Sequence, residues 1–102
     1  MRFDETADAT QVRVPVASPF EVTLNETRST GYRWDVVSDG APVSRLERDS
    51  FEAPPATPGA PGRHTWFFSA AQAGSAEIAL VYRRPFGSGN PTRRFTLRVI
   101  VE

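Results

Sequence analysis

The sequence predicts an all-β domain, because apolar and polar residues alternate in short runs along most of its 102 residues. Side chains of a strand point alternately to the two faces of a sheet, so this pattern is typical of strands with one buried face. Nine prolines and seven glycines stand mostly between the runs, where they indicate turns. No segment has a convincing helical period. Short strands with regular turn signals indicate an antiparallel sandwich or barrel.

Five runs carry the alternation clearly, and each is rich in β-branched or aromatic residues, as strands are. In chain order, their apolar positions are Val12, Val14 and Val16; Phe20, Val22 and Leu24; Tyr32, Trp34 and Val36; Ile78, Leu80 and Tyr82; and Phe95, Leu97, Val99 and Val101. Each run predicts one strand.

Two further strands are expected between the third and fourth of these runs. Residues 64–69 place Trp66 and Phe68 on the same face, and residues 43–51 form a weaker candidate. Residues 69–74 are small and alanine-rich, and they predict a tight connection rather than a helix. We expect a flexible N-terminal tail over residues 1–10, which leaves the remainder, residues 11–102, as one domain with a modest core.

Charge and composition exclude several classes of function. Twelve basic and twelve acidic residues give a formal net charge of zero, whereas a general nucleic-acid binder carries a basic excess. No apolar run is long enough to span a bilayer, and no cysteine is present to form a disulfide or act as a nucleophile. The first ten residues lack the features of a secretory signal. We therefore expect a cytoplasmic protein, or an exported one whose signal has been removed.

A polar loop that ends on a glycine is the first candidate binding segment. Its hydroxyl groups and Gly31 suit a turn, since glycine adopts a positive φ without strain, and an aromatic strand containing Trp34 follows at once. A plain strand connector would have the same features. The candidate site residues of this loop are Arg28, Ser29, Thr30, Gly31 and Tyr32.

The longest segment without strand character, residues 52–62, is the second candidate. Long structureless segments inside compact domains are uncommon and often functional, although a passive crossover between two sheets would look the same. Glycines here would let the backbone lie close against a partner. The candidate site residues are Gly59, Ala60, Pro61 and Gly62.

An Arg-Pro-aromatic turn is the third candidate, formed by Arg84, Pro85 and Phe86. Arginine beside an aromatic residue is the usual composition of an interface hot spot. The alternative is a turn whose proline ends a strand and whose Phe86 folds into the core.

Together, the three segments resemble the binding loops of the chagasin family, which are protein inhibitors of papain-like cysteine peptidases. The first loop of that family reads Asn-Pro-Thr-Thr-Gly-aromatic before a strand tryptophan, and residues 29–32 with Trp34 match its second half. The second reads Gly-x-Gly-Gly, which residues 59–62 match at both ends. The third reads Arg-Pro-Trp, which residues 84–86 match in the first two positions. The resemblance covers most of residues 11–102.

The resemblance implies an immunoglobulin-like sandwich that displays three binding loops at one end. It also implies a reversible inhibitor that blocks the cleft of a papain-like cysteine peptidase, with the first loop over the catalytic cysteine and the other two along the cleft walls. Such an inhibitor is not an enzyme and needs no nucleophile, metal or cofactor of its own. We expect it to act as a monomer.

Residues in all three loops depart from the family's patterns. Thr27 stands where asparagine is usual and Arg28 where proline is usual. Loss of the proline makes the first loop less rigid before binding, and rigidity lowers the cost of ordering a loop. Pro61 removes a backbone donor from the second loop. Phe86 keeps an aromatic anchor in the third loop but lacks the indole N–H.

Two other functions are compatible with parts of the sequence. A sandwich can be a non-inhibitory protein-binding or structural domain, since fold does not determine function. A hydrolase would need the only histidine, His64, beside Ser44 or Ser88, and nothing in the spacing supports this arrangement. A metal site built on one histidine and scattered carboxylates is equally unsupported. A lone histidine that begins a strand is more often a surface or packing residue.

Overall fold

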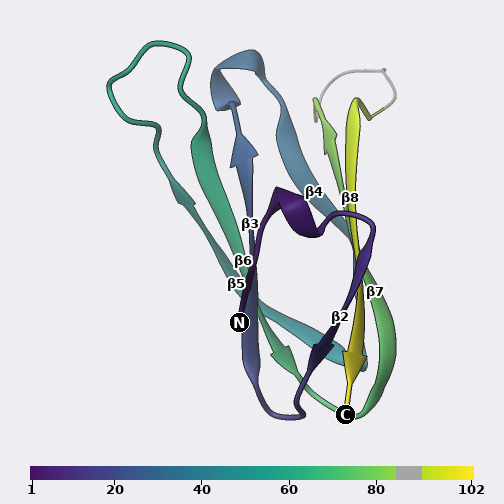
Figure 1. The fold of residues 1–102 in the computed structure, drawn as a ribbon. Helices are drawn as coiled ribbons and strands as arrows, with labels where there is room; N and C mark the ends of the chain where they lie inside the picture. The colour runs from purple at the N-terminus through teal and green to yellow at the C-terminus, as the bar shows by residue number, and fades with distance from the viewer. Residues whose placement is uncertain (85–90) are drawn as a thin grey trace.

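Two sheets of four strands pack face to face in the computed structural model, which describes residues 1–84 and 91–102 (Figure 1). In sheet A the strand order is β1 (Arg2–Phe3), β3 (Pro19–Glu26), β6 (Gly62–Ala70) and β5 (Ser44–Glu52). In sheet B it is β2 (Thr10–Val14), β8 (Arg93–Val101), β7 (Gly74–Arg83) and β4 (Arg33–Asp39). The helical segments that the structure describes are the 3₁₀ turns η1 (Glu5–Ala7) and η2 (Arg28–Thr30), and neither is long and apolar enough to cross a membrane. The all-β prediction is confirmed, and the fold is a sandwich rather than a barrel.

Most neighbouring strands run antiparallel, as predicted. In sheet A, β6 pairs with both β3 and β5 in this way, and in sheet B, β7 pairs likewise with β4 and β8. The two N-terminal strands differ, because β1 runs parallel to β3 and β2 runs parallel to β8. Both lie at a sheet edge, so they extend the antiparallel framework without changing its order.

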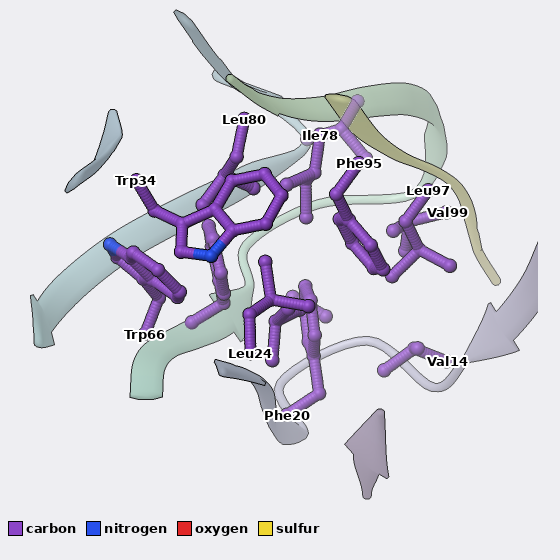
Figure 2. Packing of buried hydrophobic residues seen from close by; sticks show 14 of the residues in the cluster. Val14, Phe20, Leu24, Trp34, Trp66, Ile78, Leu80, Phe95, Leu97 and Val99 are labelled. Carbon is purple, nitrogen blue, oxygen red and sulfur yellow. The ribbon is translucent and has the colours of Figure 1, made fainter. Parts of the chain in front are cut away.

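The alternating runs supply the core between the sheets. Strands β3 and β6 bury every second side chain, as strands with one solvent-facing side do. The rings of Phe20 and Phe68 stack with their centroids 5.1 Å apart, and complete burial of such a side chain contributes about 1.5–3 kcal/mol. Figure 2 shows the buried residues Val14, Phe20, Leu24, Trp34, Trp66, Ile78, Leu80, Phe95, Leu97 and Val99.

Residues 1–10, for which we expected a flexible tail, are paired with both sheets in the structure. Strand β1 pairs with β3, and the ring of Phe3 packs edge-on against Phe20 with centroids 6.4 Å apart. After η1 the chain crosses to sheet B, where the Ala9 N–H donates to the Thr96 carbonyl at 2.8 Å. These contacts use backbone groups and one aromatic ring, so no alternating pattern in the sequence marks them.

The remaining expected elements differ from the structure only at their boundaries. The weaker strand expected over residues 43–51 is β5, and the tight connection expected before Gly74 is the turn between β6 and β7. Val16 is the exception among the expected strand residues. It lies beyond the end of β2, in a turn where the Ser18 N–H donates to the Pro15 carbonyl at 3.2 Å, and it is exposed.

The alternating strand directions bring three connections to one end of the sandwich, which we call the loop end. Figure 1 shows the β3–β4 and β5–β6 connections there, together with the last residues of β7 and the first of β8. The turns between β2 and β3 and between β6 and β7 lie at the opposite end, with the C-terminus. The candidate segments therefore approach the same end, as expected.

Candidate functional site

Two loops, together with the ends of the strands that a third loop connects, form the loop end. Loop 1 (residues 27–32) joins β3 to β4, loop 2 (residues 53–61) joins β5 to β6, and loop 3 (residues 84–92) joins β7 to β8. Figure 1 shows loop 1 between loop 2 and the ends of β7 and β8. Of the candidate residues, Pro85 and Phe86 lie outside the described residues.

Loop 1 is in contact with other residues of the loop end on both of its sides. The guanidinium of Arg28 lies 3.6 Å from the centroid of the Phe51 ring, which belongs to β5 beside loop 2. On the other side, Arg84 Nε donates a hydrogen bond to the Thr30 carbonyl at 3.2 Å. The structure thus brings candidate residues of loops 1 and 3 into direct contact.

A single turn of 3₁₀ helix gives loop 1 its shape. Residues Arg28–Thr30 form η2, and Gly31 ends it with φ at 84°, a left-handed conformation that suits glycine. Thr30 Oγ1 donates to the Thr27 carbonyl at 2.6 Å, and the Gly31 N–H donates to the Arg28 carbonyl at 2.9 Å. Loop 1 is therefore a closed turn rather than an extended segment.

The candidate residues of loop 1 divide into an exposed tip and a supporting aromatic ring. The exposed residues are Arg28, Ser29, Thr30 and Gly31. Tyr32 is half-buried, and its ring stacks on Tyr82 with centroids 5.3 Å apart. The Arg84 guanidinium lies 4.8 Å from the Tyr32 ring centroid. Tyr32 therefore supports the turn, Ser29, Thr30 and Gly31 face solvent, and the guanidinium of Arg28 lies against the Phe51 ring.

The candidate residues of loop 2 range from the surface to the interior. Gly59 is exposed with φ at 78°, and Ala60 and Pro61 are half-buried. Gly62 is buried in β6, where a Cβ atom would lie 2.3 Å from Cζ of Phe51. The same Cβ would lie 2.8 Å from the backbone carbonyl oxygen of Glu52, so the packing of β5 against β6 favours glycine at position 62.

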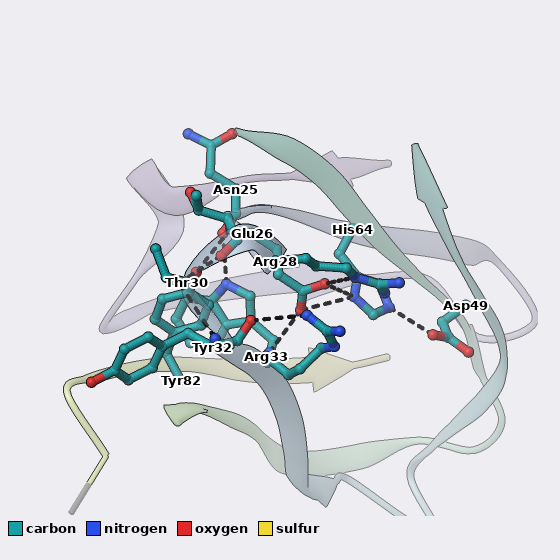
Figure 3. Close-up of polar contacts among 11 residues, drawn as sticks. Asn25, Glu26, Arg28, Thr30, Tyr32, Arg33, Asp49, His64 and Tyr82 are labelled. Atoms are coloured by element: carbon teal, nitrogen blue, oxygen red, sulfur yellow. Dashed lines mark hydrogen bonds and ion pairs between the residues drawn. The ribbon is translucent and has the colours of Figure 1, made fainter. Parts of the chain in front are cut away.

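A fully buried carboxylate lies at the base of loop 1. Glu26, the last residue of β3, is 0% exposed. Its Oε1 accepts from the Trp34 N–H at 2.7 Å and its Oε2 accepts from Arg28 Nε at 2.7 Å (Figure 3). Both oxygens also lie 3.2 Å from Nδ1 of His64. Burial raises the pKa of Glu26, but these three partners outweigh that effect and hold the pKa below its ordinary value.

His64 connects this carboxylate to the surface of the protein. Its ring stacks on Trp66 with centroids 3.9 Å apart, and its Nε2 lies 2.6 Å from Oδ2 of Asp49, which is exposed. His64 is itself buried. Of the two roles expected for a lone histidine, surface or packing, the structure shows packing.

The hydrolase alternative finds no support in the described ranges. Ser44 is buried and its hydroxyl donates to the Asp39 carbonyl at 2.6 Å, while both ring nitrogens of His64 face carboxylates. No group of three His, Asp or Glu side chains in residues 1–84 and 91–102 could hold a metal ion. Ser88 lies outside the described residues.

Sequence reasoning did not identify the polar contacts beneath loop 1. Glu26 continues the inward-facing series that ends at Leu24, and His64 shares the inward face of Trp66. A charged or polar group at an inward position needs a partner, because burying it alone is costly. The inward positions of Glu26 and His64 could therefore have indicated that these two side chains need buried polar partners. Nothing in the sequence marked Asp49 as a partner of His64.

Comparison with known proteins relates the chain to one family over most of its length. Residues 13–99 match the family described as chagasin family peptidase inhibitor I42. The chain is 29% identical over 102 residues to Amoebiasin-1 of Entamoeba histolytica, and the match covers 100% of both chains. Its fold is similar to that of the cysteine protease inhibitor EhICP2 from Entamoeba histolytica, with a TM-score of 0.87, 23% identity, and coverage of 99% of this chain and 94% of that one. It is also similar to the structure of PbICP-C in complex with falcipain-2, with a TM-score of 0.65, 17% identity, and coverage of 100% and 90%.

Proposed function

The chain belongs to the chagasin family of peptidase inhibitors, and from that membership we propose that it inhibits papain-like cysteine peptidases reversibly, by placing its loop end in their active-site cleft. Proteins of this family are inhibitors rather than enzymes. The structurally similar PbICP-C forms a complex with falcipain-2, a papain-like cysteine protease.

One observation carries the proposed mode of binding: an exposed, closed turn stands at the centre of the loop end. Ser29, Thr30 and Gly31 form the exposed part of that turn. Loop 2 lies on one side of it and Arg84 on the other. This row of loops on a rigid sandwich suits an elongated cleft, and it can supply a standard interface of roughly 800 Å² per partner.

The shape of loop 1 explains how it blocks a peptidase without becoming a substrate. A papain-like enzyme attacks a peptide carbonyl with a cysteine thiolate activated by a histidine. Loop 1 would cover that thiolate, yet its Thr30 and Gly31 N–H groups already donate to carbonyls within the turn at 3.1 and 2.9 Å. A turn closed in this way offers no extended backbone to the nucleophile.

The flanking loops would contact the walls of the cleft. Arg84 can pair with a carboxylate of the peptidase, since its guanidinium presents several donors in one plane. The proposed contacts beyond loop 1 are Gly59, Ala60 and Pro61 of loop 2, with the backbone at Gly62, and Arg84, Pro85 and Phe86 of loop 3.

Titration of papain and of a cathepsin L-like peptidase with the purified chain tests this function. We expect activity to fall in proportion to the added protein and to vanish near one equivalent. Active enzyme should return on dissociation of the complex, and the mass of the inhibitor should be unchanged, because no covalent bond forms. Full activity of both enzymes in the presence of excess chain would contradict the proposed function. Cleavage within loop 1 would contradict the proposed mode of binding.

A further inference from the structure

We propose that Glu26 is a positioning residue for inhibition, whose buried carboxylate holds loop 1 in the shape that enters the peptidase cleft. The inference rests on the function proposed above and adds to it a residue that a peptidase cannot touch. Glu26 is 0% exposed, so it can act only through the groups that it binds.

Two of those groups lie at opposite ends of loop 1. Arg28, which begins η2, donates from Nε to one carboxylate oxygen at 2.7 Å. Trp34, which follows the loop in β4, donates its backbone N–H to the other oxygen at 2.7 Å. One carboxylate therefore spans the base of loop 1 and fixes the separation of its two ends (Figure 3).

Neutral hydrogen bonds join the same base to both sheets. The Tyr82 hydroxyl of sheet B accepts from the Thr27 N–H at 2.9 Å, and the Asn25 carbonyl of sheet A accepts from Nε1 of Trp34 at 2.8 Å. Among these contacts, Glu26 supplies the charged acceptor. Hydrogen bonds to an ionised group are roughly twice as strong as neutral ones, so we expect the carboxylate to provide the largest share of the order in loop 1.

Charged or titratable side chains surround this base. Glu5 of η1 accepts from the Asn25 N–H at 2.7 Å, and Tyr32 and Arg33 lie where loop 1 enters β4. Further such side chains approach from the other elements. They are Arg28 from η2, His64 from β6, Asp49 from β5 behind His64, Tyr82 from β7, and Arg93 from β8, whose guanidinium lies 5.8 Å from the Trp34 ring centroid. Neutralising Glu26 would remove the anion that binds Arg28 and weaken the acceptor of the Trp34 N–H. Within residues 1–84 and 91–102, neither group is hydrogen-bonded to another carboxylate.

A loosened loop 1 would bind its target less tightly, even though the domain stays folded. Binding then includes the cost of ordering the loop, which a pre-organised loop avoids. The apolar core between β3, β6, β7 and β8 does not involve Glu26, so the fold should outlast the loss of the charge.

Glu26→Gln and a matched control, Glu21→Gln, test the inference. Both residues lie on β3 and both carboxylates accept from an arginine Nε, since Arg2 donates to Glu21 at 2.6 Å. Glu21 lies near the start of β3, away from the loop end. At neutral pH we expect Glu26→Gln to be folded by circular dichroism and to raise the Ki for papain by about 10- to 100-fold. Glu21→Gln should leave the Ki within about twofold of the parent.

The outcomes separate this inference from the function on which it rests. If the parent inhibits papain and a folded Glu26→Gln inhibits it equally well, the positioning role is wrong and the function stands. If the parent does not inhibit, the proposed function is wrong. In that case, or if Glu26→Gln does not fold, hydrogen exchange of the unmodified chain decides whether Glu26 orders loop 1.

Amide hydrogen exchange needs neither a variant nor a peptidase. As the pH falls below about 4, glutamates take up protons, and we expect the N–H groups of Gly31 and Trp34 to lose protection first. The N–H of Leu80, in the middle of β7, should stay protected to lower pH. Loss of protection at all three amides together would mean that Glu26 supports the whole fold rather than loop 1, and would overturn the inference.

Discussion

At the scale of single residues, Thr30 tests the proposed binding surface most sharply, since its side chain is exposed and bonds only within its own turn. We predict that Thr30→Glu raises the Ki for papain by about tenfold or more, because a larger, charged side chain would lose its water in the cleft without gaining a partner. The free energy of unfolding should fall by only about 1 kcal/mol, the usual contribution of the lost hydrogen bond. Inhibition kinetics and urea denaturation measure the two effects.

Thr10 offers a matched control for this variant. It is also exposed, and its Oγ1 donates to the Ala7 carbonyl three residues earlier at 2.6 Å, just as Thr30 Oγ1 donates to Thr27. Thr10→Glu should therefore cost similar stability but leave inhibition unchanged. An equal Ki for Thr30→Glu and the parent would show that loop 1 does not enter the cleft.

Glu26 should also make the stability of the protein depend on pH. Its pKa in the folded chain lies below the value of about 4.3 expected in the unfolded chain. The stabilisation is thus fully present above about pH 4.3 and is lost as the pH falls through the lower, folded pKa. Urea denaturation from neutral to acidic pH should show the advantage of the parent over Glu26→Gln shrinking in acid. An advantage that grows as the pH falls would contradict the assigned pKa shift.

Residue-scale prediction from the sequence succeeded for apolar side chains and failed for buried polar ones. Alternation alone placed Trp66 and Phe68 on one face, and both are buried. It could not pair Glu26 with His64, which lies 38 positions away, because the register between β3 and β6 decides that contact. The polar pairing beneath loop 1 therefore required the fold.

The contacts of Arg28 were likewise not predicted from the sequence. It replaces the proline usual in the family, and we expected this change to leave loop 1 less rigid. In the structure, Arg28 is held by the carboxylate of Glu26 and by the ring of Phe51. Glu26 ends the strand before the loop and Phe51 belongs to β5, so both partners lie outside the sequence of the loop itself.

At the scale of elements, the N-terminal segment makes a specific contribution to stability. Its Glu5 Oε1 accepts from the Asn25 N–H at 2.7 Å and from Arg63 at 3.0 Å, and the ring of Phe3 packs on Phe20. We predict that deleting residues 1–9 lowers the free energy of unfolding by about 2–4 kcal/mol, through lost hydrogen bonds and lost apolar contact. Urea denaturation measures the change.

The same deletion distinguishes an integral segment from a tail. If it changed stability by less than about 0.5 kcal/mol, these residues would behave as the flexible tail that we expected over residues 1–10. The other strands were predictable because period-two alternation repeats along them. Strand β1 has only two residues, which is too short for any period to be visible.

At the scale of the whole molecule, the order of the strands places the loops. From β3 onward, β3, β5 and β7 end at the loop end and β4, β6 and β8 begin there (Figure 1). The connection that follows each of β3, β5 and β7 therefore lies at the loop end, whichever residues it contains. The candidate segments could be located from the sequence for this reason, whereas their contacts, such as Arg84 with the Thr30 carbonyl, depend on how the two sheets pack.

If the loop end is the surface that enters the peptidase, papain should protect it from amide hydrogen exchange. Exchange of the chain, measured free and in complex with papain, should be slower in the complex at residues 28–31 and 59–60. It should be unchanged in the turn between β6 and β7 at the opposite end. Slower exchange confined to that opposite turn, or to the outer face of either sheet, would contradict this prediction.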